Sequence, residues 1–85
     1  MREFEYTIKD PVGIHARPAG MLVQKAKGLA SAVTLEKGGK KADAKKLFSV
    51  MTLCAKQGDT LLVRCDGADE ETAAAELQRF FEENL

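Results

Sequence analysis

The chain has 85 residues, of which 45% are hydrophobic and 31% are charged, a balance typical of a folded globular domain and not of a disordered tail. We therefore expect one small domain spanning residues 1–85. No apolar run approaches the roughly 18 residues that cross a bilayer, and the first residues lack the apolar stretch of a signal peptide. We expect a cytoplasmic protein without membrane insertion.

The charges of the chain sum to zero, but they are unevenly distributed. Residues 1–56 hold 11 Lys/Arg against 5 Asp/Glu, whereas residues 57–85 hold 2 against 8. Because the domain is not net basic, general nucleic-acid binding is disfavoured. The basic part suits an acidic protein surface, although the two charge sets could equally balance one another on a solvated surface.

A strand and then a helix are expected first. Apolar and polar residues alternate over residues 3–8, the period of a strand with one buried face. Asp10, Pro11 and Gly13 interrupt this pattern. From Ala16 to Gly28 the apolar residues recur at helical spacing, and the expected inner stripe comprises Ala19, Leu22, Val23 and Ala26.

A hairpin follows. Val33 and Leu35 share one face of a strand expected over residues 31–37. The Gly38-Gly39 pair is typical of a hairpin turn, and a short polar return strand is expected over residues 40–44.

Residues 46–54, KLFSVMTLC, do not alternate as a half-buried strand would, and this favours a short helix. Apolar residues surround more than one face of it, so some of them must be exposed. We expect Val50 and Leu53 to be buried and Phe48 and Met51 to be outside. The alternative is that all of residues 47–54 belong to the core.

The last two elements are a strand and a helix. Residues 61–65 alternate as a strand with Leu61, Val63 and Cys65 on its inner face. Asp69 is expected to cap the final helix, whose inner stripe comprises Ala73, Leu77, Phe80 and Phe81.

Strands with one polar face predict a single antiparallel sheet with helices on one side. The fold class is therefore α+β, an open-faced β-sandwich in the order βαββαβα. The uncovered face, which carries Glu3, Glu5, Thr34 and Arg64, is polar, so we expect a monomer.

The two cysteines are too few for a disulfide scaffold or a zinc site, and their spacing is not characteristic of either. With one histidine available, a tetrahedral metal site would need Asp or Glu ligands. We expect no metal and no cofactor, and we expect Cys54 and Cys65 to be reduced thiols that act as small apolar packing groups.

The only histidine, His15, lies where the first helix begins, within the stretch GIHARPAG. The first amides of a helix lack internal partners and carry the positive end of its dipole. Together with Arg17 they would hold an anion placed on the imidazole, and positive surroundings disfavour imidazolium. Histidine is also not a preferred N-cap. These features favour a working histidine that holds an anion or accepts a phosphoryl group over a capping one, with a merely structural or solvated histidine as the alternative.

Nothing in the chain is typical of a hydrolase or a nucleotide-binding enzyme, since there is no second histidine and no glycine-rich phosphate cradle. The stretch GIHARPAG followed by MLVQKAK resembles the active-site segment of HPr, the histidine phosphocarrier family of the bacterial phosphoenolpyruvate-dependent sugar phosphotransferase system. The likeness extends over essentially the whole chain, through KKLFSVMTL, the QGD turn and DGADEETAAAELQRFF.

The resemblance implies a carrier and not an enzyme with its own turnover. It would accept a phosphoryl group from Enzyme I on Nδ1 of His15 and pass it to sugar-specific EIIA proteins. Arg17 would neutralise the group, and the amides of Ala16 and Arg17 would face its oxygens. The implied partner-binding surface has an apolar centre and a polar rim. The centre comprises Gly20, Leu47, Phe48 and Met51, and the rim comprises Gln24, Lys27, Lys45, Lys46 and Ser49.

The chain also departs from the family pattern. Lys46 stands where many members from Gram-positive bacteria have a regulatory serine, and lysine cannot accept that modification. Gln24 is neutral where some members are basic, and Val12 stands where some members have a small polar residue. Cys54 stands where glycine is common, so we expect the second helix to run slightly longer here.

A second function remains open at this point. A regulatory paralogue could keep the fold and act by binding a transcription factor or an enzyme, or could belong to a nitrogen-related branch of the same system. The presence of His15 and Arg17 disfavours a binding-only role, since binding alone would not require a nucleophile.

Overall fold

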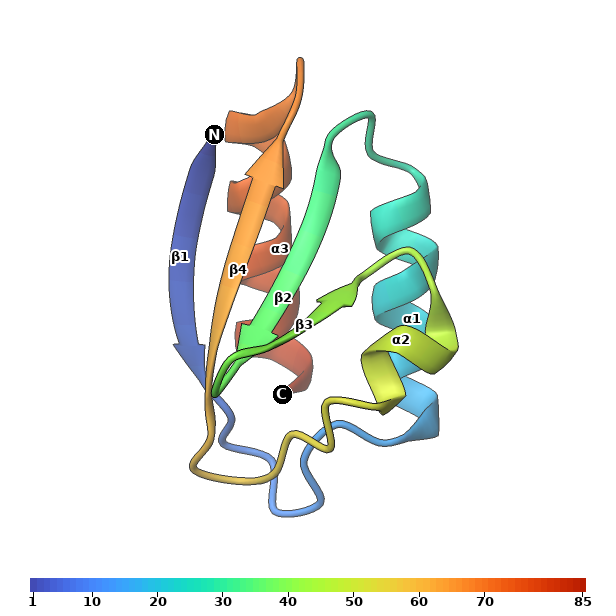
Figure 1. Ribbon diagram of the computed structural model, residues 1–85, viewed down its shortest axis with the longest axis vertical. Helices are drawn as coiled ribbons and strands as arrows, with labels where there is room; N and C mark the ends of the chain where they lie inside the picture. Colours follow the sequence, from blue (N-terminus) through green and yellow to red (C-terminus); the bar gives the residue numbers. More distant parts are fainter.

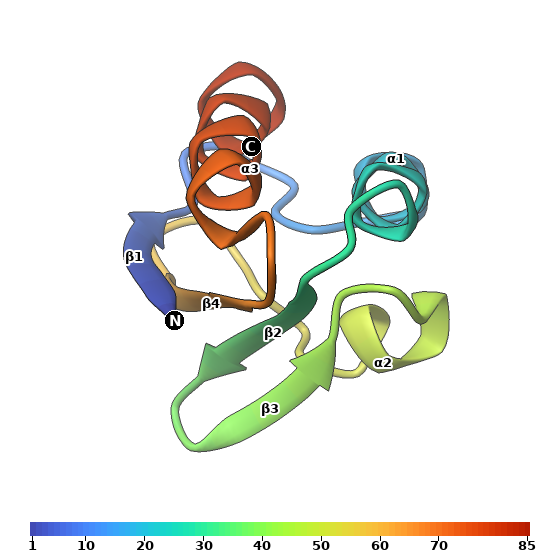
Figure 2. The same cartoon turned by 90° about the horizontal axis from the view of Figure 1, so that it is seen from above.

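Four strands form one antiparallel sheet, and three helices lie on one of its faces (Figures 1 and 2). The computed structural model describes residues 1–85 and confirms the expected order βαββαβα. None of its helices combines the length and the apolar character that a membrane span requires. The elements are β1 (Arg2–Thr7), α1 (Ala16–Lys27), β2 (Ala32–Lys37), β3 (Lys40–Asp43), α2 (Leu47–Met51), β4 (Thr60–Asp66) and α3 (Glu70–Asn84).

The strand order β1-β4-β2-β3 brings the first strand beside the last one. The registers Phe4↔Val63, Val63↔Leu35 and Leu35↔Ala42 place one row of apolar side chains across the sheet. Because side chains alternate between the two faces of a strand, a single correct register directs this whole row toward the helices.

The core lies between this sheet face and the helices. The expected stripes of α1 and α3 are buried, as is the inner face of β4. Phe81 of α3 stacks on Tyr6 at 5.4 Å between ring centroids and meets Phe4 edge-on at 6.1 Å. This aromatic cluster fixes α3 against β1, since aromatic pairs contribute roughly 0.5–1.5 kcal/mol beyond the area that they bury.

The opposite face of the sheet is polar, as expected. Arg64 in the central strand β4 donates to Glu3 of β1 at 2.6 Å and to Glu36 of β2 at 2.9 Å. One guanidinium therefore links three strands across the uncovered face.

The end of α2 differs from the prediction. The helix spans only Leu47–Met51, and Leu53 and Cys54 then donate to carbonyls three residues earlier, at 3.2 Å each. Cys54 has φ +52, in the left-handed region, although it is not glycine. The expectation that a non-glycine residue would prolong the helix was wrong. The Cys54 thiol is exposed and is not a packing group, whereas Cys65 is buried as expected.

The start of α3 also differs from the prediction. Asp69 occupies the N-cap position, but its side chain makes no capping bond. Its carboxylate instead accepts the Ser31 hydroxyl and the amides of Ser31 and Ala30, at 2.8 Å and 2.9 Å for the two amides. These bonds lower the pKa of Asp69 and tie the turn after α1 to the start of α3. In addition, β3 ends at Asp43, one residue earlier than expected.

The Asp69 contacts predict an acid-sensitive contribution to stability. Because the pKa of Asp69 is lowered by folding, its carboxylate stabilises the fold above about pH 4, and this contribution is lost as the pH falls through the folded pKa. Asp69→Asn should therefore lower the free energy of unfolding at pH 7 and reduce its further loss on acidification. Urea denaturation between about pH 7 and pH 2 measures both quantities.

Glu76→Gln, at an exposed position of α3, is the matched control and should change neither quantity. An Asp69→Asn variant with the same acid sensitivity as the parent protein would contradict the assignment.

Candidate functional site

The segment that leads from β1 to α1 is held at several points. The Asp10 carboxylate accepts the Val12 amide at 2.8 Å, and the Asp10 carbonyl accepts the Gly13 amide at 2.9 Å. The amides of Lys9 and Asp10 donate to a terminal oxygen of Leu85, at 2.7 Å and 2.8 Å. The loop that carries His15 is thus shaped by its own turn and bound to the end of α3.

His15 is the N-cap residue of α1. Its backbone is extended, with φ −126 and ψ −178, and its carbonyl accepts the Ala19 amide at 2.9 Å. Its side chain makes no capping hydrogen bond and is half-buried. The backbone of His15 therefore starts the helix while the imidazole is left for other chemistry.

The first two amides of α1 are free. Ala16 and Arg17 donate no hydrogen bond within the protein, since the first four amides of a helix have no acceptor in their own helix. Pro18, the third helical residue, has no amide proton and is buried. Two backbone donors thus remain beside His15, at the positive end of the helix dipole.

A shallow depression of about 230 Å³ brings His15 and Arg17 together, as the sequence predicted. Pro18 and Met21 of α1, Asp10 of the loop, and Glu83 and Asn84 of α3 complete its lining. The contribution of α3 was missed, because no local pattern links the end of the chain to a loop near its beginning. No three His, Cys, Asp or Glu side chains converge to offer a metal site.

This arrangement can hold an anion attached to the imidazole. The Arg17 guanidinium and the amides of Ala16 and Arg17 supply charge-assisted and helix-end hydrogen bonds to such a group. Two acidic residues, Asp10 and Glu83, line the same depression and add negative charge. The site therefore combines attraction with repulsion, and is not a purely cationic trap.

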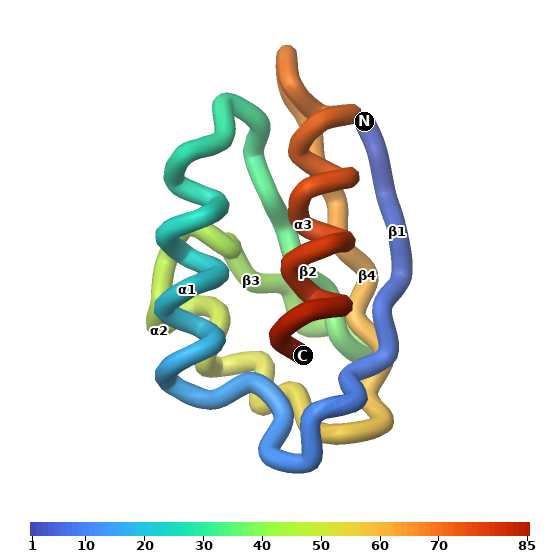
Figure 3. The backbone as a smooth tube through the Cα atoms, turned by 180° about the vertical axis from the view of Figure 1, so that it is seen from behind, coloured from blue at the N-terminus to red at the C-terminus, as the bar shows by residue number.

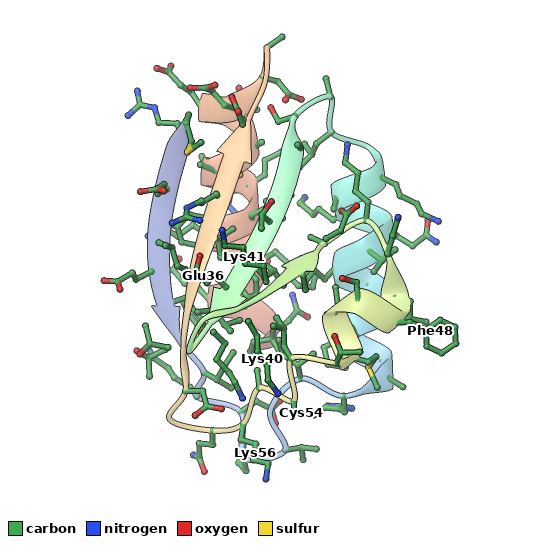
Figure 4. All side chains as sticks on the ribbon, viewed as in Figure 1. Glu36, Lys40, Lys41, Phe48, Cys54 and Lys56 are labelled. Carbon is green, nitrogen blue, oxygen red and sulfur yellow. The ribbon has the colours of Figure 1, made fainter.

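The expected two-sided character of α2 is confirmed. Val50 and Leu53 are fully buried, at 0% exposure each, whereas Phe48 is 86% exposed, Leu47 43% and Met51 37%. Figure 4 shows the Phe48 ring projecting away from the helix. The alternative that all of residues 47–54 are core is therefore wrong. We use the name α1–α2 face for the surface that comprises Leu47, Phe48 and Met51 of α2 and Gly20, Gln24 and Lys27 of α1.

The expected rim residues lie on α1, on α2 and in the segment that leads into α2. Gly20, Gln24 and Lys27 follow one ridge of α1, which packs beside α2 (Figure 2). Lys46 is the exposed N-cap residue of α2, and the ammonium of Lys45 donates to the Leu29 carbonyl at 3.0 Å. The Ser49 hydroxyl accepts the Asp43 amide at 2.9 Å, so it also has a structural role.

The cations of the α1–α2 face have no carboxylate partners. The ion pairs of the molecule use the terminal amine, Arg2, Lys37 and Arg64, which lie on or beside the sheet. Arg17, Lys27, Lys45 and Lys46 form none. Basic residues on α1 and at the start of α2 are thus left without a carboxylate partner within the protein.

Comparison with known proteins gives a consistent result. The family model described as the PTS HPr component phosphorylation site matches residues 2–83. Phosphocarrier protein HPr of Mycoplasma genitalium is 39% identical over 85 residues, covering 99% of this chain and 97% of that protein. HPr-C-His from Thermoanaerobacter tengcongensis has a TM-score of 0.92 at 38% identity, covering 96% of this chain and 92% of that one.

The catabolite repression protein Crh of Bacillus subtilis is similar as well. Its structure has a TM-score of 0.79 at 33% identity and covers 100% of this chain and 98% of that one.

The two faces of α2 should respond differently to truncation. Phe48→Ala is expected to change the free energy of unfolding by no more than about 0.5 kcal/mol, because the ring is already in solvent. Leu53→Ala, just beyond the helix and fully buried, should lower it by about 2–5 kcal/mol. Urea denaturation of both variants measures the difference, and a large loss in Phe48→Ala would contradict the exposed placement.

Proposed function

Because this chain belongs to the HPr family of phosphotransferase-system phosphocarriers, we propose that it carries the phosphoryl group on His15. Members of this family are phosphorylated components of a relay and not catalysts. The observation that supports His15 is its half-buried imidazole, which is not used for capping and lies beside Arg17 and two free helix amides.

The proposed transfer places a lone pair of the neutral imidazole, on Nδ1, in line with the donor's phosphoryl group. The new P–N bond forms while the bond between phosphorus and the donor breaks, and the electron pair of that bond stays with the donor. Passing the group to an acceptor reverses these roles. The carrier thus ends each cycle with His15 unmodified.

The neighbours of His15 would stabilise the bound phosphoryl group without reacting with it. Arg17 supplies a permanent positive charge, and the amides of Ala16 and Arg17 supply donors that need no reorganisation. Asp10 and Glu83, on the same depression, would oppose the accumulation of negative charge. This balance suits a group that must be released again.

The partners of the family belong to the phosphotransferase system. For this chain we assign Enzyme I as the donor and EIIA proteins as acceptors, and place their docking on the α1–α2 face. Its apolar centre fits an apolar patch on each partner, and its unpaired lysines fit acidic surroundings. Because donor and acceptor would use one face, the carrier would leave the first before it meets the second.

A regulatory role through binding is the second candidate, and its support is the likeness to Crh over the full chain. Such a protein would use the α1–α2 face to bind a transcription factor or an enzyme, or would serve a nitrogen-related branch. His15 and Arg17, which share one depression, favour the phosphoryl carrier.

The central test is phosphorylation. Incubation with phosphoenolpyruvate and a cognate Enzyme I should yield one acid-labile phosphoryl adduct per chain, detected by intact-mass spectrometry at neutral pH. His15→Ala should yield none, because the acceptor nitrogen is gone. The absence of an adduct on the parent protein would refute the carrier function.

Lys46 provides a test of the docking assignment. Lys46→Glu reverses one rim charge and should raise the KM for phosphorylation by Enzyme I about three- to tenfold, with the effect shrinking at high salt. Lys41→Glu makes the same charge change at an exposed position of β3 and is the matched control. Equal behaviour of the two variants would remove Lys46 from the docking surface.

A further inference from the structure

The linker between α2 and β4, residues 52–59, runs beside the loop that carries His15. Figure 3 shows the two segments at the same end of the molecule. They are joined at two places: Ile8 exchanges backbone bonds with Asp59 and Gly58 at 2.9 Å each, and the Ile14 amide donates to the Ala55 carbonyl at 3.0 Å. The second bond lies immediately before His15.

The linker packs so closely against the loop at Gly13 that no side chain fits between them. A Cβ atom on Gly13 would clash with the Ala55 carbonyl oxygen and would lie 2.8 Å from Cα of Lys56. Gly13 also has φ +77, a conformation that L side chains rarely adopt. The Ala55 carbonyl therefore rests against Gly13 and binds Ile14, the two residues that precede His15.

The chain reaches that carbonyl from α2 through Cys54, the residue before Ala55. Cys54 is the one non-glycine residue of the chain with positive φ, at +52, a conformation that is sterically costly for any residue with a side chain. Such strain persists only where the surroundings restrain the backbone, and it is concentrated at functional sites.

The surroundings of Cys54 supply this restraint. Its carbonyl accepts the Lys37 ammonium at 3.2 Å, and the same ammonium pairs with Asp59 at 3.4 Å. The Asp59 carboxylate in turn accepts the Lys56 amide at 2.9 Å. On both sides of Cys54 the side chains of Leu53 and Ala55 are buried.

We propose that Cys54 is a positioning residue for phosphoryl transfer: its left-handed backbone directs the Ala55 carbonyl onto Gly13 and Ile14 and so sets the place of His15. The inference rests on the proposed function of His15. Cys54 follows the end of α2 by three residues, so one short segment joins the docking helix to the loop of the nucleophile. The conformation of this segment therefore sets the position of the attacking nitrogen relative to a partner docked on the α1–α2 face.

Two substitutions at one position test this role. Both remove the thiol, but Cys54→Gly permits positive φ freely, whereas β-branched Cys54→Val strongly disfavours it. With phospho-Enzyme I as donor, Cys54→Gly should keep the parent rate. Cys54→Val should lower kcat about tenfold or more, with KM within about twofold, since small misplacement of reacting groups is costly and the α1–α2 face is unchanged.

A second pair uses glycines. Gly13→Ala introduces both positive-φ strain and the clash with Ala55, and it should likewise lower kcat. Gly39→Ala introduces comparable strain at φ +87 in the β2–β3 turn, where an added Cβ meets nothing within 4 Å, and it should not. Circular dichroism and urea midpoints establish that each variant is folded before its kinetics are compared.

Hydrogen exchange of the parent protein gives an answer even if the strained variants do not fold. The Ile14 amide should exchange at least about tenfold more slowly than an open amide, because it is bonded to Ala55. An unprotected Ile14 amide would overturn the proposal, as would equal kcat values for folded Cys54→Val and Cys54→Gly. If the parent protein itself accepts no phosphoryl group, it is the proposed function that fails.

Discussion

The pairing of β1 with β4 is the constraint on which the rest of the structure depends. It joins the first strand of the chain to the last one, in the register Phe4↔Val63, and the bonds of Ile8 with Gly58 and Asp59 extend the contact beyond the strands. The loop after β1 and the linker before β4 are thereby placed at one end of the molecule (Figure 3). The functional depression forms there, because α1 starts and α3 ends at the same place.

Two helices, α1 and α3, mainly stabilise the fold, whereas α2 presents a surface for recognition. In α1 and α3 a buried stripe faces the sheet, and the Phe81 cluster joins α3 to β1. The short helix α2 buries Val50 and leaves Phe48 in solvent, a distribution that stability alone would not favour. The cations around it form no ion pair, whereas the terminal amine, Arg2, Lys37 and Arg64, on or beside the sheet, each have a carboxylate partner. Exposed apolar side chains and unpaired cations thus occur together at α2, a combination suited to a partner.

Prediction from the sequence succeeded where local patterns and core packing agree. The alternation in β4 and the stripe of α3 appear as expected, because each side chain's burial follows directly from the period of its element. Prediction was wrong at the end of α2 and at Asp69. Left-handed Cys54 is held by Lys37, and Asp69 finds donors in the turn after α1. Both partners are distant in the sequence, so residue preferences near each site give no sign of them.

The sequence by itself determined the order of the elements, the inner faces, and the position of His15 and Arg17 at a helix start, because these depend on spacing along the chain. The resemblance of GIHARPAG and the segments after it to a phosphocarrier family supplied the chemistry. Only the tertiary structure decided that Glu83 and Asn84 share the depression of His15, and that the Ala55 carbonyl supports its loop. These contacts join segments that meet only after the strands have paired, and no local pattern encodes such a meeting.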